Sequence, residues 1–218
     1  LFLFRATRSA AVPKEVLGEP PLPGVLVVDR YRGYNRAPCA LQYCYAHLQR
    51  EVEDLGKEFP DTPEAGAFTE TLIPLLAEAM HLQSQPLPDP DYYTAAAQIK
   101  DRIGDVIEQP AQHLGIRRIQ DIFREHPDRL YHWVADRQVP PDNNRYEREL
   151  RPTVIARKVS FGSQSDAGAK TREILMSVLH TLRKRRADAQ AHLKWVLDQL
   201  AADPKRDPFA LLFLNDTS

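Results

Sequence analysis

The spacing of apolar residues predicts strands in the first fifth of the chain and helices through most of the remainder. Val25–Val28 is a continuous apolar run, the pattern of a buried parallel strand, and Asp29 stands at its C-terminal end. The segments LFLFRA (residues 1–6) and CALQYCYAH (residues 39–47) are also rich in strand-favouring residues. Ligands gather at the C-terminal ends of strands in open α/β sheets, so Asp29 is a candidate functional residue.

Apolar residues that recur every three or four positions predict amphipathic helices elsewhere. The predicted helices cover residues 9–17, 48–55, 62–81, 92–107, 119–123, 130–134, 169–185 and 189–200. Pro74 is expected to kink the third of these, and the proline-rich stretch 85–91 is expected to connect the third to the fourth. Residues 60 to about 137 therefore form a mostly helical insert after the strands, and their apolar positions are core stripes.

Composition indicates a globular protein with one well-buried core and a smaller appendage, since 43% of its 218 residues are apolar and 27% charged. The sequence contains no run of 18 apolar residues, so it predicts no membrane span, and its first ten residues do not resemble a signal peptide. Two cysteines give no disulfide framework. We expect a cytoplasmic protein. Because the first residue is Leu, we also expect the chain to be part of a longer one.

The net charge of −1 is unevenly distributed along the chain. Residues 145–186 hold eleven Lys or Arg against four Asp or Glu, whereas residues 61–91 hold six acids and no Lys or Arg. A concentrated basic surface is typical of proteins that bind a polyanion. The RKRR run at residues 183–186 has two interpretations, a solvated helix end or a phosphate contact.

The stretch PPDNNRYERELRPTVIARK (residues 140–158) places a carboxylate at a predicted helix entrance. Helix N-cap residues precede Glu147, which falls in the first or second turn, and Arg151 lies one turn further along the same face. Further basic residues follow, namely Arg148, Arg157 and Lys158. The alternative interpretation is an ordinary capped surface helix with an exposed Glu–Arg pair.

Three other residues have open interpretations. Asp29 either forms a turn before Arg30 or binds a metal or substrate. Cys39, Cys44 and His47 have a C-x4-C-x2-H spacing that could begin a zinc site, but no fourth ligand is near, so we favour packing for the cysteines. His47 could face the same cleft as Asp29.

Several segments together resemble, in wording and order, the IS66 family of bacterial insertion-sequence transposases. They are GVLVVDRYRGYN, CYAH, DNNRYERELRPTVIARK, FGSQSDAGAKT and AHLKWVLDQL. The resemblance covers nearly the whole chain. Its most distinctive part is the block DNN-x-x-ER-x-LRP.

The resemblance implies an α/β fold of the ribonuclease-H-like type, with the first strands missing, and DDE chemistry. It implies that Asp29 is the second catalytic acid and Glu147 the third, both as metal ligands. Two Mg2+ (or Mn2+) ions about 4 Å apart would then be held in the complete domain. Arg148, Arg151, Arg157 and Lys158 become expected contacts to DNA phosphates.

The chain divides on this basis into four predicted segments. Residues 1–59 are a partial core with the second acid, 60–137 the helical insertion, 138–202 the rest of the core with the third acid and C-terminal helices, and 203–218 a tail. Two residues depart from the family, which usually has glycine at Ala156 and asparagine at Val159. The family's first catalytic Asp lies upstream of the segment that matches residues 1–9.

We therefore expect a fragment of a transposase catalytic domain, whose complete form cleaves DNA strands and transfers them during transposition. The isolated fragment is expected to be nearly inert. Its expected partners are the DNA ends of the mobile element and further copies of itself. The alternatives are a non-catalytic DNA-binding or interfering remnant of a transposase and a helical interaction protein without a DNA role, whose apolar tail FALLFL would bind a partner.

Overall fold

The computed structural model describes residues 2–5, 7, 9–18, 21–160, 162–163 and 165–214. These residues form two compact units. The larger unit spans 7–149, and the smaller combines 150–218 with the first six residues.

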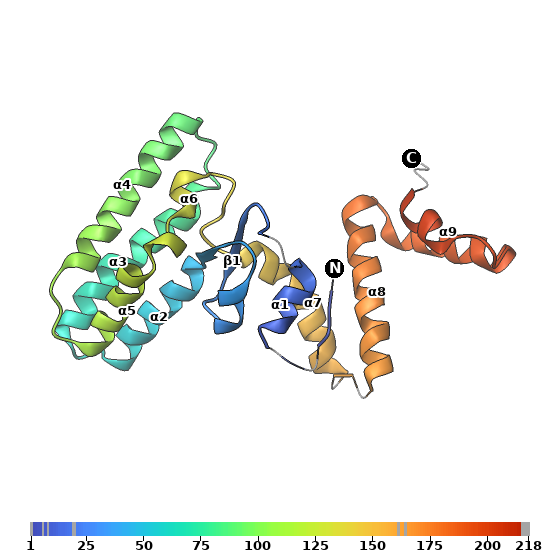
Figure 1. Ribbon diagram of the computed structural model, residues 1–218, viewed down its shortest axis with the longest axis horizontal. Helices are drawn as coiled ribbons and strands as arrows, with labels where there is room; N and C mark the ends of the chain where they lie inside the picture. The colour runs from blue at the N-terminus through green and yellow to red at the C-terminus, as the bar shows by residue number, and fades with distance from the viewer. Residues whose placement is uncertain are drawn as a thin grey trace. The chain divides into compact units, whose positions relative to one another are not determined.

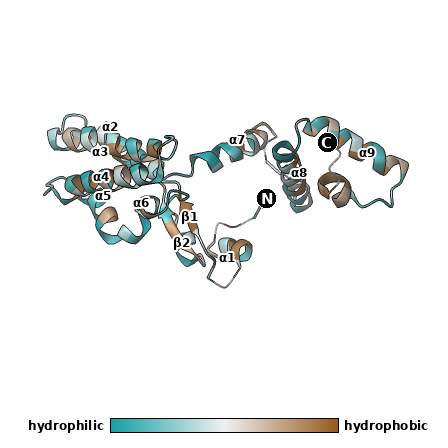
Figure 2. Ribbon diagram, turned by 90° about the horizontal axis from the view of Figure 1, so that it is seen from above, coloured by the Kyte–Doolittle hydropathy of each residue, from teal (hydrophilic) through white to brown (hydrophobic). Residues whose placement is uncertain are grey.

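The larger unit contains a pair of parallel strands, β1 (Val25–Val28) and β2 (Ala40–Tyr43). Their register pairs Val25 with Ala40 and Val28 with Tyr43, and the backbone N–H of Cys44 extends the ladder by donating to the Val28 carbonyl at 2.8 Å. A short 3-10 helix, η1 (Arg32–Arg36), begins the crossover between the strands. β1 is apolar (Figure 2), whereas β2 includes the polar Gln42, and their parallel pairing confirms the predicted parallel strand at residues 25–28.

Helices make up most of the larger unit. They are α1 (Ala11–Leu17), α2 (Tyr45–Glu58), α3 (Pro63–Leu82), α4 (Asp89–Glu108), α5 (Leu114–Glu125), η2 (Pro127–Arg129) and α6 (His132–Ala135). Helices α2 to α6 lie together in a bundle, with β1 beside them (Figure 1). The predicted apolar stripes form its core, which includes Leu72, Leu76, Ile99, Ile103 and Ile116. The proline-rich connector is shorter than predicted, because α4 begins at Asp89.

Two polar side chains of the strand β2 and its continuation attach the helical insert to the sheet. Gln42 is fully buried; its Nε2 donates to the Leu130 carbonyl at 3.1 Å, and its Oε1 accepts from the His132 N–H at 3.0 Å. The Tyr45 hydroxyl also donates to the Leu130 carbonyl, at 2.8 Å. The burial of these groups is compatible with folding because each has a partner.

The helix α7 (Asn144–Val159) supplies residues to both units, since the division falls between Glu149 and Leu150. The helices α8 (Asp166–Arg185) and α9 (Ala189–Ala202) and a single-turn π-helix, η3 (Ala210–Leu214), complete the smaller unit. The first three residues of RKRR belong to α8, which ends at the same residue as the helix predicted over residues 169–185. Within the tail segment, Leu211 is buried while Leu214 is exposed.

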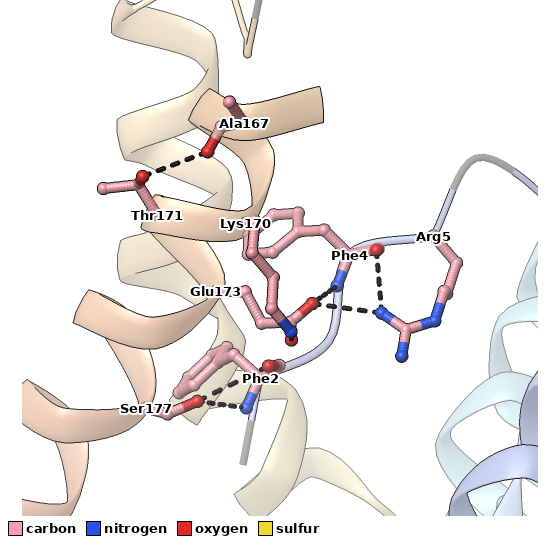
Figure 3. A network of polar contacts seen from close by, with 8 residues as sticks. All are labelled: Phe2, Phe4, Arg5, Ala167, Lys170, Thr171, Glu173 and Ser177. Carbon is pink, nitrogen blue, oxygen red and sulfur yellow. Dashed lines mark hydrogen bonds and ion pairs between the residues drawn. The ribbon is translucent and has the colours of Figure 1, made fainter. Parts of the chain in front are cut away.

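The prediction of a strand over residues 1–6 is wrong for the part that the structure describes, residues 2–5. Phe2–Arg5 is not in a strand; it lies along α8 instead (Figure 3). The Phe2 N–H donates to Ser177 Oγ at 2.9 Å, and the Phe4 N–H donates to Glu173 Oε2 at 3.2 Å. Side chains on one helix therefore satisfy the N–H groups that a neighbouring strand would satisfy in a sheet. Leu1 and Ala6 lie outside the described residues.

The segment Phe2–Arg5 can follow α8 because the repeat distance of an extended chain matches that of a helix. Two residues of extended chain advance about 6.6 Å, and four residues of helix advance about 6 Å. Alternate N–H groups of the segment therefore meet side chains four positions apart, at Glu173 and Ser177.

Parallel strands and covering helices agree with the α/β class predicted from the sequence. No helix in the described part of the chain is both long and apolar enough to cross a membrane.

Candidate functional site

Asp29 directly follows β1 and forms a turn with its own backbone. Its Oδ1 accepts a hydrogen bond from the Tyr31 N–H at 3.1 Å, the geometry of an Asx-turn. Arg30 has a positive φ of 64°, which is uncommon for a residue other than glycine, and its guanidinium pairs with Glu51 on α2. One carboxylate oxygen of Asp29 therefore forms a turn, as one of the two interpretations predicted. Because the side chain is exposed, the other oxygen is open to a ligand.

Glu147 lies in the first turn of α7, as predicted. Asp142 Oδ1 accepts from the Asn144 N–H at 2.9 Å, and the Asn143 carbonyl accepts from the N–H groups of Tyr146 and Glu147 at 3.0 Å. These bonds fix the start of the helix and hence the direction of Glu147. The helix continues through Pro152 to Val159.

The start of α7 is joined to the end of β2 by paired contacts. The buried Cys44 thiol donates to Asn143 Oδ1 at 3.1 Å, and the Asn143 N–H donates back to Cys44 Sγ at 3.4 Å. One turn further along both helices, His47 Nε2 lies 3.5 Å from Glu147 Oε1. Burial raises the pKa of the Cys44 thiol, more than the nearby backbone N–H groups of Asn143, His47 and Ala46 lower it. The thiol is therefore a protonated donor at neutral pH.

The sheet register places both acids at one edge of the sheet. Asp29 follows β1, and Cys44 follows the adjacent parallel strand β2 and pairs with the last residue of β1. Since Cys44 and His47 bind the start of α7, Glu147 also lies at this C-terminal edge. A segment 118 residues later in the sequence is thereby brought to the strand ends.

The carboxylate oxygens at this edge of the sheet could supply some of the ligands of a hard divalent cation. Carboxylate oxygens are the ligands that Mg2+ prefers, and Asp29 Oδ2 and Glu147 Oε2 have no hydrogen-bond partner among the described residues. Asp29 and Glu147 thus offer two carboxylate oxygens of the kind that such an ion binds. Within the same described part of the chain, no group of three or more His, Cys, Asp or Glu side chains is placed to hold a metal ion.

The four predicted phosphate contacts are all exposed. Arg148 belongs to the larger unit, whereas Arg151, Arg157 and Lys158 belong to the smaller. None of them forms an ion pair with a carboxylate in the part of the chain that the structure describes. The partner of Glu147 is His47. The exposed Glu–Arg pair of the alternative interpretation is therefore not formed.

Sequence reasoning missed the pairing of the two motifs. It treated CYAH as a strand end or part of a zinc site, and assigned no role to Asn143 beyond capping. The spacing held a signal, because Cys44 and His47 are three residues apart and Asn143 and Glu147 are four apart. Both intervals equal about one helical turn, so two helices that start side by side can form both contacts.

A comparison with known protein families identifies the family of this chain. A family model described as the transposase IS66 family matches residues 1–171. The chain belongs to the IS66 family of transposases. The match to this transposase family includes Asp29, His47 and Glu147 and the four predicted phosphate contacts of α7. No curated protein and no solved structure matches the chain.

Proposed function

We propose that this IS66 family chain is the part of a transposase catalytic domain that contributes the second and third metal-binding carboxylates, Asp29 and Glu147. The observation that supports the proposal best is the contact between His47 and Glu147, which brings the third acid to the strand edge where Asp29 lies. The two acids are 118 residues apart and the helices α2 to α6 lie between them in the sequence, so the acids do not meet through local sequence.

The chemistry of the proposed site is DNA strand cleavage followed by strand transfer. Asp29 and Glu147 would hold Mg2+ or Mn2+, which activates the attacking oxygen and stabilises the leaving oxygen when bound. Each acid contributes an outward carboxylate oxygen, while its other oxygen is held by the Tyr31 N–H or by His47. A DDE site uses three acids and Asp29 and Glu147 are two of them, so we expect little strand cleavage from these two acids alone.

His47 acts as a positioning residue in this proposal. Its Nε2 lies 3.5 Å from Glu147 Oε1, close enough to orient the carboxylate. Cys44 and Asn143 hold the two backbone segments together beneath this pair.

DNA would be held by Arg148, Arg151, Arg157 and Lys158, whose charges are exposed and not neutralised by described carboxylates. The proposed partners are the DNA ends of the mobile element and further copies of the chain.

Divalent-metal binding tests the proposal without requiring turnover. In a Mn2+ titration followed by electron paramagnetic resonance, Asp29→Asn and Glu147→Gln should each weaken binding by about tenfold or more. Glu149→Gln is the matched control, because Glu149 is on the same helix but turned away from Glu147 by its position, and should bind Mn2+ like the unmodified chain. Equal affinity in all four proteins would contradict the proposed metal site.

The non-catalytic DNA-binding remnant is a second candidate, supported by the exposed basic residues of α7. It shares the DNA contacts but does not require metal ligands. Tight, salt-dependent DNA binding by a chain that fails the Mn2+ test would favour it.

A further inference from the structure

A hollow of about 940 Å³ lies beside Asp29 in the larger unit. One wall is the segment that follows β1, which contributes Tyr31 and Arg32, and the other is α5 of the helical insert, which contributes Leu114, Arg117 and Arg118. The candidate metal site uses none of these five side chains. The cleft joins the sheet edge to an element that sequence analysis treated only as core.

Three arginines line this cleft without a carboxylate partner. Arg32, Arg117 and Arg118 are exposed, and none forms an ion pair with a described carboxylate. Arg117 donates one bond, from Nη2 to the Gln112 carbonyl at 3.3 Å, which leaves most of its donors available. Exposed arginine N–H groups that form no ion pair with a described carboxylate can donate hydrogen bonds to phosphate oxygens.

Acidic residues also line the cleft, namely Asp29, Asp121 and Glu125. Asp121 lies 3.7 Å from the Arg124 guanidinium, and Asp29 is the proposed metal ligand. Glu125 is therefore the carboxylate that most directly opposes a bound anion.

Apolar surface is exposed between the charges. The Leu114 side chain is 74% exposed and Tyr31 is 37% exposed. Gly33 makes room for the tyrosine, since a Cβ at that position would lie 2.3 Å from Tyr31 Cε1. The Tyr31 ring thus packs on the glycine backbone, which holds the ring in place while part of it remains exposed to the cleft.

We propose that this cleft binds an unpaired nucleic-acid strand, with Arg32, Arg117 and Arg118 on its phosphates and Tyr31 stacked on a base. A groove that combines arginines with an exposed aromatic ring is the usual means of binding single strands, because every base has a face for stacking. The exposed Tyr31 ring favours a single strand, because unpaired bases present their faces for stacking. The inference rests on the proposed function, since the bound strand leads to Asp29.

Fluorescence anisotropy with a labelled fifteen-nucleotide oligothymidine in EDTA tests the proposal. Arg117→Gln/Arg118→Gln should weaken binding about tenfold and reduce the log–log salt slope by about 1.4, which corresponds to two phosphate contacts on a single strand. The matched control is Lys57→Gln/Arg102→Gln, which removes two exposed charges of the same unit outside the cleft. Equal losses in the two double variants would overturn the proposal.

Stacking is tested separately from charge. Tyr31→Ala should weaken binding about tenfold and Tyr31→Phe about twofold or less, because phenylalanine keeps the ring face. Gly33→Ala should weaken binding by displacing the ring, and Glu125→Gln should tighten it. Equal affinity of Tyr31→Ala and the unmodified chain, in proteins with the same circular dichroism, would overturn the role of Tyr31.

Because this assay contains no metal ion, it tests the strand cleft separately from the proposed metal site. Asp29→Asn should keep or increase the affinity for the oligonucleotide even though it weakens Mn2+ binding. Failure of the Mn2+ titration with the arginine effect intact would reject the proposed metal site and leave the strand cleft standing. Loss of the arginine effect with Mn2+ binding intact would reject the cleft alone.

Discussion

At the residue scale, Cys44 and His47 connect the sheet to Glu147, the proposed third acid. The Cys44 thiol donates a hydrogen bond to the Asn143 side chain, and its sulfur accepts one from the Asn143 N–H. One turn later, His47 contacts Glu147. Each residue of the C-x-x-H spacing therefore has a defined partner in the block that contains Glu147. Neither contact requires a zinc ion.

The His47 contact predicts a measurable effect on metal affinity. His47→Ala should weaken Mn2+ binding about tenfold, because Glu147 loses the group that orients it, whereas His47→Gln should recover part of the affinity through its amide donor. Arg50→Ala serves as control, since Arg50 is exposed on the same helix. Unchanged affinity in His47→Ala would show that Glu147 needs no such support.

Burial of Cys44 predicts a pH-dependent stability. Its raised pKa means that its contribution is fully present below the unfolded thiol pKa of about 8.5 and is lost as the pH rises through that value toward the folded pKa. The free energy of unfolding should therefore fall between about pH 7.5 and pH 9.5 more steeply in the unmodified chain than in Cys44→Ser. Parallel pH profiles in urea denaturation would contradict this.

Sequence reasoning placed Asp29 and Glu147 correctly on their elements, because apolar runs and N-cap residues are local signals. It could not place His47 against Glu147, since that contact joins segments 100 residues apart. The arginines of α5 were missed for a related reason. Their role depends on the loop after β1, which lies far away in the sequence.

At the element scale, Gln42 fixes the helical insert to β2. Gln42→Leu keeps the side-chain volume but leaves the His132 N–H without its acceptor and removes one of the hydrogen bonds that the Leu130 carbonyl accepts. We expect the free energy of unfolding to fall by about 1–3 kcal/mol. Gln49→Leu, on the neighbouring helix, is the comparison variant, and an equal effect of both in urea denaturation would contradict the special role of Gln42.

The segment Phe2–Arg5 illustrates why its predicted strand was wrong. Apolar and aromatic residues favour an extended backbone, but an extended segment becomes a strand only where a partner offers backbone donors and acceptors. Ser177 and Glu173 take that role on α8. The local sequence therefore predicts an extended backbone but does not predict that the segment pairs with a helix.

This contact predicts amide exchange that depends on pH and on position. The Lys170 ammonium, followed by the Phe4 N–H, lowers the pKa of Glu173. Protection of the Phe4 amide should therefore be full above the ordinary Glu pKa of about 4.3 and be lost as the pH falls through the lowered folded pKa.

Two variants separate the two hydrogen bonds when exchange is followed by NMR. Glu173→Ala should accelerate exchange mainly at Phe4, and Ser177→Ala mainly at Phe2. The same exchange rates in both variants would show that the segment is not held by these side chains.

At the scale of the whole molecule, the basic surface of α7 predicts a steep salt dependence of duplex DNA binding. Changing Arg148, Arg151, Arg157 and Lys158 together to Gln should reduce the log–log slope by about 3 to 4, since each phosphate contact contributes about 0.9. The control changes four other exposed charges, Arg102, Lys194, Lys205 and Arg206, to Gln. An equal reduction in the control would assign DNA binding to net charge alone.

The central claim is that Asp29 and Glu147, far apart in sequence, bind the same metal ion. Replacing Mg2+ by Fe2+ and adding ascorbate and peroxide generates radicals that cut the chain next to a bound iron. Mass spectrometry should find cuts near both Asp29 and Glu147, suppressed by excess Mg2+ and absent in Asp29→Asn. Cuts near only one of the two acids, or cuts that Mg2+ does not suppress, would contradict a shared site.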